Sequence, residues 1–256
     1  PWSFSKLKAF DTCPKQFYHE KVLKEYPFVQ TDAILYGNEF HKACENYIGD
    51  EEPLPERFLY VKNALDTLND KRGVKLCEKK LGITADLEPC GFYDKRVWFR
   101  GIADLLIIDV VGSVAWVVDY KTGKSAKYAD KGQLELMALS VFAHYPDIDR
   151  VKAGLFFVIA GDLVRDTYKT LDKANLWKKW MANYAKMEAA FEADANRMER
   201  QRARRKMDKK GINRKGKDIA HKKALSRGGS NKDGVKLQSP SKNRSAGGKL
   251  SRGKRK

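Results

Sequence analysis

The chain has 256 residues, 42% of them hydrophobic, and a formal net charge of +18. This length and apolar content predict a folded globular body with a buried core, large enough for one domain with an appendage or for two small domains. No apolar run reaches the ~18–20 residues that a membrane-spanning helix requires. The sequence therefore does not predict a membrane-spanning helix.

The positive charge is concentrated at one end of the chain. Residues 196–256 hold 23 Lys and Arg against 4 Asp and Glu, whereas residues 1–195 hold 28 against 29. Cationic side chains that neutralise phosphates release condensed counterions, so a basic tail of this kind favours nucleic acid as a partner. The alternative is an extension that only increases solubility.

The four cysteines, Cys13, Cys44, Cys77 and Cys90, stand singly and form no Cys-x-x-Cys pair. This spacing fits neither a zinc site nor a dense disulfide framework, and it predicts free thiols in a reducing compartment. The first residues show no charged-then-apolar signal pattern. We therefore expect a soluble cytoplasmic protein that has no membrane partner.

The first third of the chain has helical periodicity. Residues 3–24 predict two short helices interrupted at Cys13-Pro14, and residues 36–47 predict a helix that carries His41 and Glu45 on one face. Residues 56–72 have the apolar spacing of a further amphipathic helix.

The middle of the chain changes to short β-branched and aromatic runs, followed by a mixture of helix and strand. Strands are expected at 97–103, 104–109, 114–119 and 151–160, with an edge strand at 163–170 and a helix at 133–145. Asp172 is a suitable N-cap for a long helix from Lys173. This pattern predicts an α/β fold in which helices flank a mixed central β-sheet.

From residue 196 the apolar stripe of the last helix ends. Residues 197–206 have a composition that can continue the helix as an exposed basic extension. Beyond Gly211 the apolar content is too low for the chain to fold well unaided. We therefore divide the chain into a body of residues 1–195 and a basic tail of residues 196–256.

Two aspartates meet in the predicted hairpin. If residues 110–113 form its connection, Asp109 lies opposite Val114, and counting back places Asp104 opposite Asp119. Opposed carboxylates repel each other unless a cation lies between them. A hard divalent ion such as Mg²⁺ suits this geometry.

Lys121 adds an amine to the pair of aspartates. Side chains alternate along a strand, so Asp119 and Lys121 project to one side and Val118 and Tyr120 to the other. Lys121 would then stabilise negative charge that builds up on a phosphate during the reaction. The competing interpretation is that the aspartates only cap strands and that Lys121 pairs with one of them at the surface.

Five motifs occur in order along the chain. They are a helical segment in residues 3–18, Gly37-Asn-Glu-Phe-His41, Gly101-Ile-Ala-Asp104, Asp119-Tyr-Lys-Thr-Gly-Lys124 and Gln133-Leu-Glu-Leu-Met137. In turn they resemble the N-terminal helix signature, the histidine motif, the two core motifs and the following helix of the RecB-like branch of the PD-(D/E)XK nucleases, which includes many phage exonucleases. The resemblance covers about residues 3–170.

The resemblance implies a restriction-endonuclease-like core, a role for each motif residue, and Mg²⁺ or Mn²⁺ as cofactor. Asp104 and Asp119 would bind the metal with His41 as a further ligand, Lys121 would help to activate water, and Gln133 would complete the site. Glu78 stands where the family often has another glutamate and would be a further metal ligand. Without the family, His41 would be interpreted as an ordinary helix histidine.

Some relatives of this branch hold an iron–sulfur cluster through one cysteine near the N-terminus and three after the core. No cysteine follows Cys90 in this chain, so we expect no such cluster. The resemblance implies a Mg²⁺-dependent deoxyribonuclease, in particular an exonuclease of a phage or mobile element that acts in recombination, replication or DNA degradation. A non-catalytic DNA-binding protein on the same scaffold is the main alternative.

The basic tail is similar in part to the HNH, or His-metal finger, motif of phage endonucleases. His221 and Asn243 match that motif, whereas Ala220 and Gly234 stand where an aspartate and an asparagine are expected. We interpret the tail as a degenerate module that keeps DNA affinity; an active HNH endonuclease and a disordered basic tail are the alternatives. The expected phosphate contacts are Arg204, Arg205, Lys209, Lys210, Lys222, Lys223 and Arg244.

Overall fold

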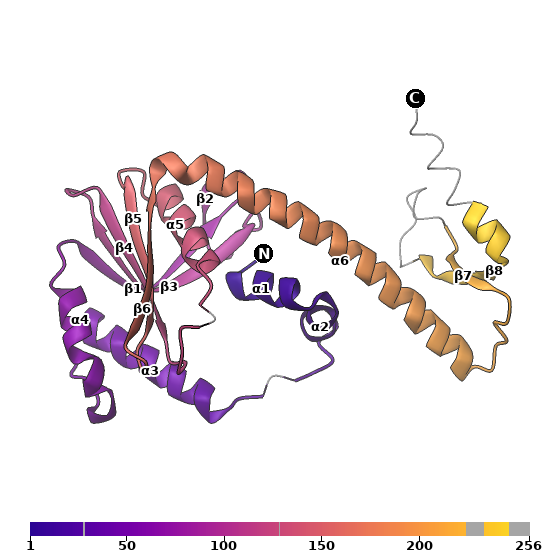
Figure 1. Cartoon of the computed structure of the whole chain (residues 1–256), viewed down its shortest axis with the longest axis horizontal. Helices are drawn as coiled ribbons and strands as arrows, with labels where there is room; N and C mark the ends of the chain where they lie inside the picture. Colours follow the sequence, from indigo (N-terminus) through magenta and orange to yellow (C-terminus); the bar gives the residue numbers. More distant parts are fainter. Residues whose placement is uncertain (28, 128, 224–232, 246–256) are drawn as a thin grey trace.

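A six-stranded sheet forms the centre of the protein, as the computed structural model of residues 1–27, 29–127, 129–223 and 233–245 shows (Figure 1). The strands lie in the order β2-β1-β3-β4-β5-β6, with β4 and β5 parallel and the other neighbours antiparallel. The α/β fold with a mixed central sheet is therefore confirmed. The strands are β1 (Val74–Ile83), β2 (Pro89–Cys90), β3 (Phe99–Asp109), β4 (Val114–Lys121), β5 (Arg150–Phe157) and β6 (Asp162–Lys169).

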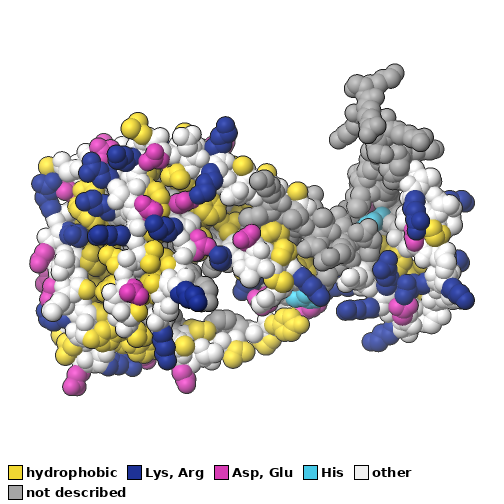
Figure 2. Space-filling view, viewed as in Figure 1, with side chains coloured by type: hydrophobic (Ala, Val, Ile, Leu, Met, Phe, Trp, Pro, Cys, Tyr) yellow, Lys and Arg dark blue, Asp and Glu magenta, His cyan; other side chains and the backbone are white. Residues whose placement is uncertain are grey.

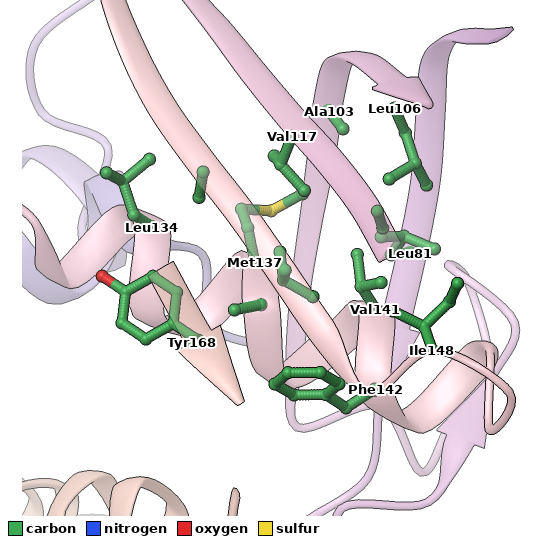
Figure 3. Close-up of a cluster of buried hydrophobic side chains, with 14 of the residues drawn as sticks. Leu81, Ala103, Leu106, Val117, Leu134, Met137, Val141, Phe142, Ile148 and Tyr168 are labelled. Carbon is green, nitrogen blue, oxygen red and sulfur yellow. The ribbon is translucent and has the colours of Figure 1, made fainter. Parts of the chain in front are cut away.

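Helix α5 (Gly132–His144) is the crossover between the parallel strands β4 and β5, and it covers one face of the sheet. Its apolar residues are buried on nearly all sides, because it packs against the strands on one side and the N-terminal region on the other. Figure 3 shows Leu134, Met137 and Val141 of α5 among side chains from the strands, such as Val117. This core fixes the end of α5 that carries Gln133.

The opposite face of the sheet is covered by α3 (Asp32–Gly49), a 3₁₀ turn (Glu56–Val61) and α4 (Lys62–Asn69). The sequence predicted a helix starting near residue 36, but α3 begins at Asp32 because the Thr31 hydroxyl accepts a hydrogen bond from Ile34 N at 3.4 Å. Phe40 and Phe58 are fully buried beneath these elements. The buried side of α3 therefore places His41 beside Asp104 of β3.

The N-terminal helices pack beside the sheet through aromatic rings. As predicted, the chain breaks at Cys13-Pro14, between α1 (Phe4–Thr12) and α2 (Pro14–Phe17), and a π-helical turn (Tyr18–Val22) follows. Trp2 forms a parallel bridge with Phe99 of β3 and contacts the rings of Phe10 and Phe17. These contacts hold α1 and α2 near the end of β4.

The runs 97–103 and 104–109 predicted two strands, but the structure has one continuous strand, β3, with a break in its side-chain alternation. Ala103 packs with the α5 side of the core, whereas Leu105, two residues later, packs with the α3 side. Residues two apart in a regular strand share a face, so the alternation shifts by one at Asp104. Strand β1, which the sequence did not predict, shifts at Glu78, where φ is +48°.

The last elements extend away from the sheet along α6 (Lys173–Lys209), which runs unbroken across residue 195 (Figure 1). The helix starts at the predicted residue, but the Asp172 side chain accepts from Lys169 N instead of capping α6. Beyond Gly211, where we expected little structure, β7 (Asp218–His221) pairs with β8 (Val235–Gln238), and residues 240–245 are helical. Ile219 is buried in this small unit, which gives it an apolar centre.

Within the described residues, no helix is both long enough and apolar enough to cross a bilayer.

The pairing of β1 with β3 depends on Gly73, so Gly73→Ala is expected to destabilise the fold. Its φ is +125°, and an added Cβ would lie 2.5 Å from the Ile108 carbonyl oxygen. Strain together with a backbone clash is expected to lower the free energy of unfolding by roughly 3 kcal/mol or more. Gly161→Ala is the comparison, because its φ is +71° but an added Cβ would meet open space. We expect it to lower the free energy of unfolding by about 1–2 kcal/mol. Urea denaturation measures both values; equal losses would contradict the role of the close approach.

Candidate active site

Three carboxylate residues lie at one level of three adjacent strands. Glu78 and Asp104 are missing from the β1–β3 ladder, but their neighbours pair on both sides, so the two residues oppose each other. The predicted hairpin register is confirmed, because Asp109 pairs with Val114 and the ladder continues to Leu105 and Val118. The next position in that register places Asp104 opposite Asp119.

The break in the ladder is filled by the Asp104 side chain. Its Oδ2 accepts a hydrogen bond from the backbone N–H of Tyr120 at 2.6 Å, just beyond the last β3–β4 pair. The Asp104 carboxylate is thus fixed against the backbone of β4. Its other oxygen, Oδ1, lies 3.3 Å from His41 Nδ1, which α3 supplies.

His41, Glu78 and Asp104 form a compact group of potential metal ligands, whose nearest ligand atoms all lie within 4.8 Å of one another. Two carboxylates and an imidazole are suitable donors for Mg²⁺ or Mn²⁺, which are otherwise coordinated by water and phosphate. In the absence of an ion, two carboxylates so close together repel each other. The donor set therefore fits a hard divalent cation.

Asp119 lies beside this group but has different partners. Its carboxylate is buried, forms an ion pair with the Lys121 ammonium and accepts a hydrogen bond from Gln133 Nε2 at 2.5 Å. Asp119 and Lys121 thus project to the same side, whereas Val118 and Tyr120 pack in the α3 side of the core, as the alternation predicted. The strand register alone paired Asp104 with Asp119 around the ion, and the family resemblance added His41 and Glu78 as ligands. In the structure, His41, Glu78 and Asp104 form the compact group, and Asp119 lies beside it.

The pKa values of the site reflect its concentration of negative charge. Burial and the nearby Asp104 raise the pKa of Asp119 to about 6, although Lys121 and His41 partly oppose this shift. Burial and Asp104 also raise the pKa of Glu78. Burial lowers the pKa of His41, but the hydrogen bond to Asp104 and the surrounding carboxylates outweigh burial, so the net shift is upward. Without a cation, this site favours protonation.

Two clefts flank the end of β4. The first has a volume of about 710 Å³, opens between α3 and the sheet, and contains His41, Glu78 and Asp104. The second, of about 610 Å³, lies between the N-terminal helices and the sheet and contains Lys121 and Gln133. We call His41, Glu78 and Asp104 the metal-ligand group. This group opens to one cleft and Lys121 opens to the other, so each is accessible from its own side of the strand.

The first cleft also contains polar residues that the sequence analysis did not select as site residues. Asn38, Lys42 and Glu45 come from α3, and Thr122 follows Lys121 at the end of β4. The spacing of His41 and Glu45 indicated a shared face, but a helical face alone does not show which neighbour it meets. That information required the packing of α3 against β1 and β3.

The predicted phosphate-binding residues of the tail are all exposed. Within the described part of the chain, none of the seven takes part in a salt bridge, whereas Arg202 pairs with Glu25 and Arg214 with Asp208. Figure 2 shows Lys and Arg side chains gathered on the unit that contains β7 and β8. His221 ends β7, and Asn243 Nδ2 donates to Asp218 Oδ2 at 3.1 Å. Among the residues described there, no three His, Cys, Asp or Glu side chains lie close enough together to hold a metal ion.

Comparison with known proteins agrees with this geometry. Residues 1–210 match the PD-(D/E)XK nuclease superfamily. No curated protein matches the chain. A solved structure titled "Crystal structure of SSO0001" is 15% identical, with 67% of this chain and 86% of that chain covered and a TM-score of 0.27.

The superfamily match includes the whole six-stranded sheet, α3 and α5. It also includes the six candidate site residues of the body, which are His41, Glu78, Asp104, Asp119, Lys121 and Gln133. The structure independently gives the mixed sheet and the acidic group with a lysine at one strand end. The chain belongs to the PD-(D/E)XK nuclease superfamily, which implies a metal-dependent nuclease that hydrolyses phosphodiester bonds.

Proposed function

We propose that this protein is a Mg²⁺- or Mn²⁺-dependent DNA exonuclease of the RecB-like branch. The observation that carries the proposal is the His41, Glu78 and Asp104 group next to the Asp119–Lys121 ion pair. Motifs of that branch occur in order along the chain, and the basic tail favours DNA as the substrate. A phage or mobile-element enzyme of recombination, replication or DNA degradation fits this combination.

His41, Glu78 and Asp104 would hold the cation, and Asp119 would lie at its side. A bound divalent ion polarises a phosphoryl oxygen and lowers the pKa of water, which supplies a nucleophile at neutral pH. The Lys121 ammonium, held by Asp119, is placed to stabilise negative charge on the phosphate. Gln133 donates to Asp119 and keeps that carboxylate oriented toward the lysine.

The basic arm, defined as residues 202–245, would hold the substrate near the body. Its exposed residues Arg204, Arg205, Lys209, Lys210, Lys222, Lys223 and Arg244 offer contacts to backbone phosphates, which position a protein without reading sequence.

A second candidate function is an HNH-type endonuclease in the arm. The pairing of β7 with β8, the following helix and the position of His221 at the end of β7 favour it. Ala220 and Gly234, at positions where the motif has an aspartate and an asparagine, argue against it. We therefore assign cleavage to the body and substrate binding to the arm.

Digestion of end-labelled linear, circular and single-stranded DNA tests the proposed activity. We expect Mg²⁺-dependent loss of linear substrates from their ends, because an exonuclease needs a free terminus. Closed circles are expected to resist, and Asp119→Ala is expected to remove the activity. Cleavage of closed circles at the rate of linear DNA would contradict exonuclease action.

Lys121→Ala is expected to lower kcat by about 100-fold or more, because it removes a charge that acts on the phosphate. Lys178→Ala is the matched control, since Lys178 is exposed on α6 away from the site. His221→Ala is expected to leave cutting largely intact. If His221→Ala is inactive and Lys121→Ala remains active, the catalytic site lies in the arm and the proposal is contradicted.

Metal binding is expected to stabilise the protein more at high pH. The raised pKa values of Asp119, Glu78 and His41 add stability that is fully present below the unfolded-state pKa values. That stability is lost as pH rises through about 6 for Asp119 and through the raised pKa of each other group. A cation compensates for this loss, so the Mg²⁺-induced rise in Tm should be larger at about pH 8 than at about pH 5.5.

Differential scanning fluorimetry with excess Mg²⁺ or with EDTA measures this difference in Tm. Glu78→Gln should reduce the Mg²⁺-induced rise at high pH, because a candidate ligand is lost. Glu88→Gln, an exposed glutamate before β2, serves as the control and should behave as wild type. A Mg²⁺ effect independent of pH would contradict the proposed ligand group.

Replacement of Lys209 and Lys210 by Gln is expected to weaken DNA binding and its salt dependence. Each lost phosphate contact should reduce the slope of log K against log salt by about 0.9 on duplex DNA. Fluorescence anisotropy over a range of NaCl concentrations measures this slope. An unchanged slope would show that the arm does not contact the phosphates.

A further inference from the structure

A cationic and aromatic patch lies on β1, β3 and the turn at residues 91–97. We define the Arg100 patch as Lys80, Phe92, Tyr93 and Arg100. The Arg100 guanidinium carbon lies 4.9 Å from the centre of the Phe92 ring and 5.7 Å from that of Tyr93, and Lys80 Nζ is 6.0 Å from the Phe92 ring. The Tyr93 side chain is 76% exposed.

The charge of the patch is not neutralised by carboxylates. Within the described residues, neither Lys80 nor Arg100 forms a salt bridge, whereas Arg96 in the same turn pairs with Asp94 at 2.8 Å. Further cations lie close by, since burial and the charges of Arg100 and Lys21 lower the pKa of Lys6. The rings attract these cations, but the cations repel one another, and a bound anion would relieve that repulsion.

The patch is connected to the metal-ligand group along β3. Arg100, Ile102 and Asp104 alternate on one face of the strand, and Ile102 lines the cleft that contains Asp104. Lys80 pairs with Ile102 across the strands, two residues from Glu78. At about 3.3 Å per residue, Arg100 lies about 13 Å from Asp104, a few nucleotides along an extended strand.

We propose that the Arg100 patch binds an unpaired nucleic-acid strand whose scissile phosphate lies at the His41, Glu78 and Asp104 group. The inference rests on the proposed nuclease function and deepens it by naming a single strand as the species in the site. Rings accept stacked bases only when those bases are unpaired, and cations beside the rings bind the phosphates. Duplex DNA would then have to fray at its end before the strand enters.

Binding measured in EDTA tests the inference without any cleavage. We expect Tyr93→Ala to weaken binding of a labelled oligothymidylate about 10-fold, the lower part of the range for loss of one stacked base. Tyr93→Phe should bind as wild type, and a blunt hairpin duplex should bind equally to all three proteins. Arg100→Gln should weaken single-strand binding, whereas the matched control Arg96→Gln should not.

Photo-crosslinking of an oligonucleotide that carries 5-iododeoxyuridine locates the contact directly, so binding by the arm does not obscure it. We expect adducts on Phe92 or Tyr93, in addition to any in the arm. Adducts only within residues 202–245, together with unchanged binding by Tyr93→Ala, would overturn the inference. If wild type binds at the patch but cleaves nothing with Mg²⁺, the proposed nuclease function fails and the binding site remains.

Discussion

Electrostatic repulsion among three carboxylates at one level of the sheet is the constraint on which the rest of the structure depends. Glu78, Asp104 and Asp119 follow one another across β1, β3 and β4, at the end of a hydrophobic core. Burial and repulsion from Asp104 raise the pKa values of Asp119 and Glu78 and disfavour their ionised state. The fold compensates with His41 beside Asp104, Lys121 beside Asp119, and a donor set that suits a divalent cation.

The shift in side-chain alternation is the structural means by which these groups converge. Without this shift, Ala103 and Leu105 would lie on the same face of the sheet. Regular backbone pairing would then continue past Asp104 and leave no space for its carboxylate against β4. The shift occurs on both β1 and β3 at the same level, which preserves their pairing on each side. Because the Tyr120 N–H is satisfied by Asp104, the break leaves no unpaired donor at that position.

The site is supported by two separate halves of the core. The α5 side holds Gln133 against Asp119, and the α3 side holds His41 against Asp104. The two clefts lie on either side of the strand end that carries Lys121. The basic arm adds positive charge at a distance from the sheet, because the continuous helix α6 leads to it (Figure 1).

The sequence alone determined the α/β class, the hairpin register around Asp104 and Asp119, and the common side of Asp119 and Lys121. These follow from local rules of period and turn length, which tertiary contacts did not override. The family resemblance had marked Glu78 as a candidate ligand, but only the tertiary structure placed it next to His41 and Asp104, because β1 has mixed polarity and its left-handed residue has no local sequence pattern. The tertiary structure also decided which side chains bind each aspartate. Asp119 contacts Lys121 and Gln133 because core packing brings α5 against β4, and the spacing of residues in the sequence does not show this contact.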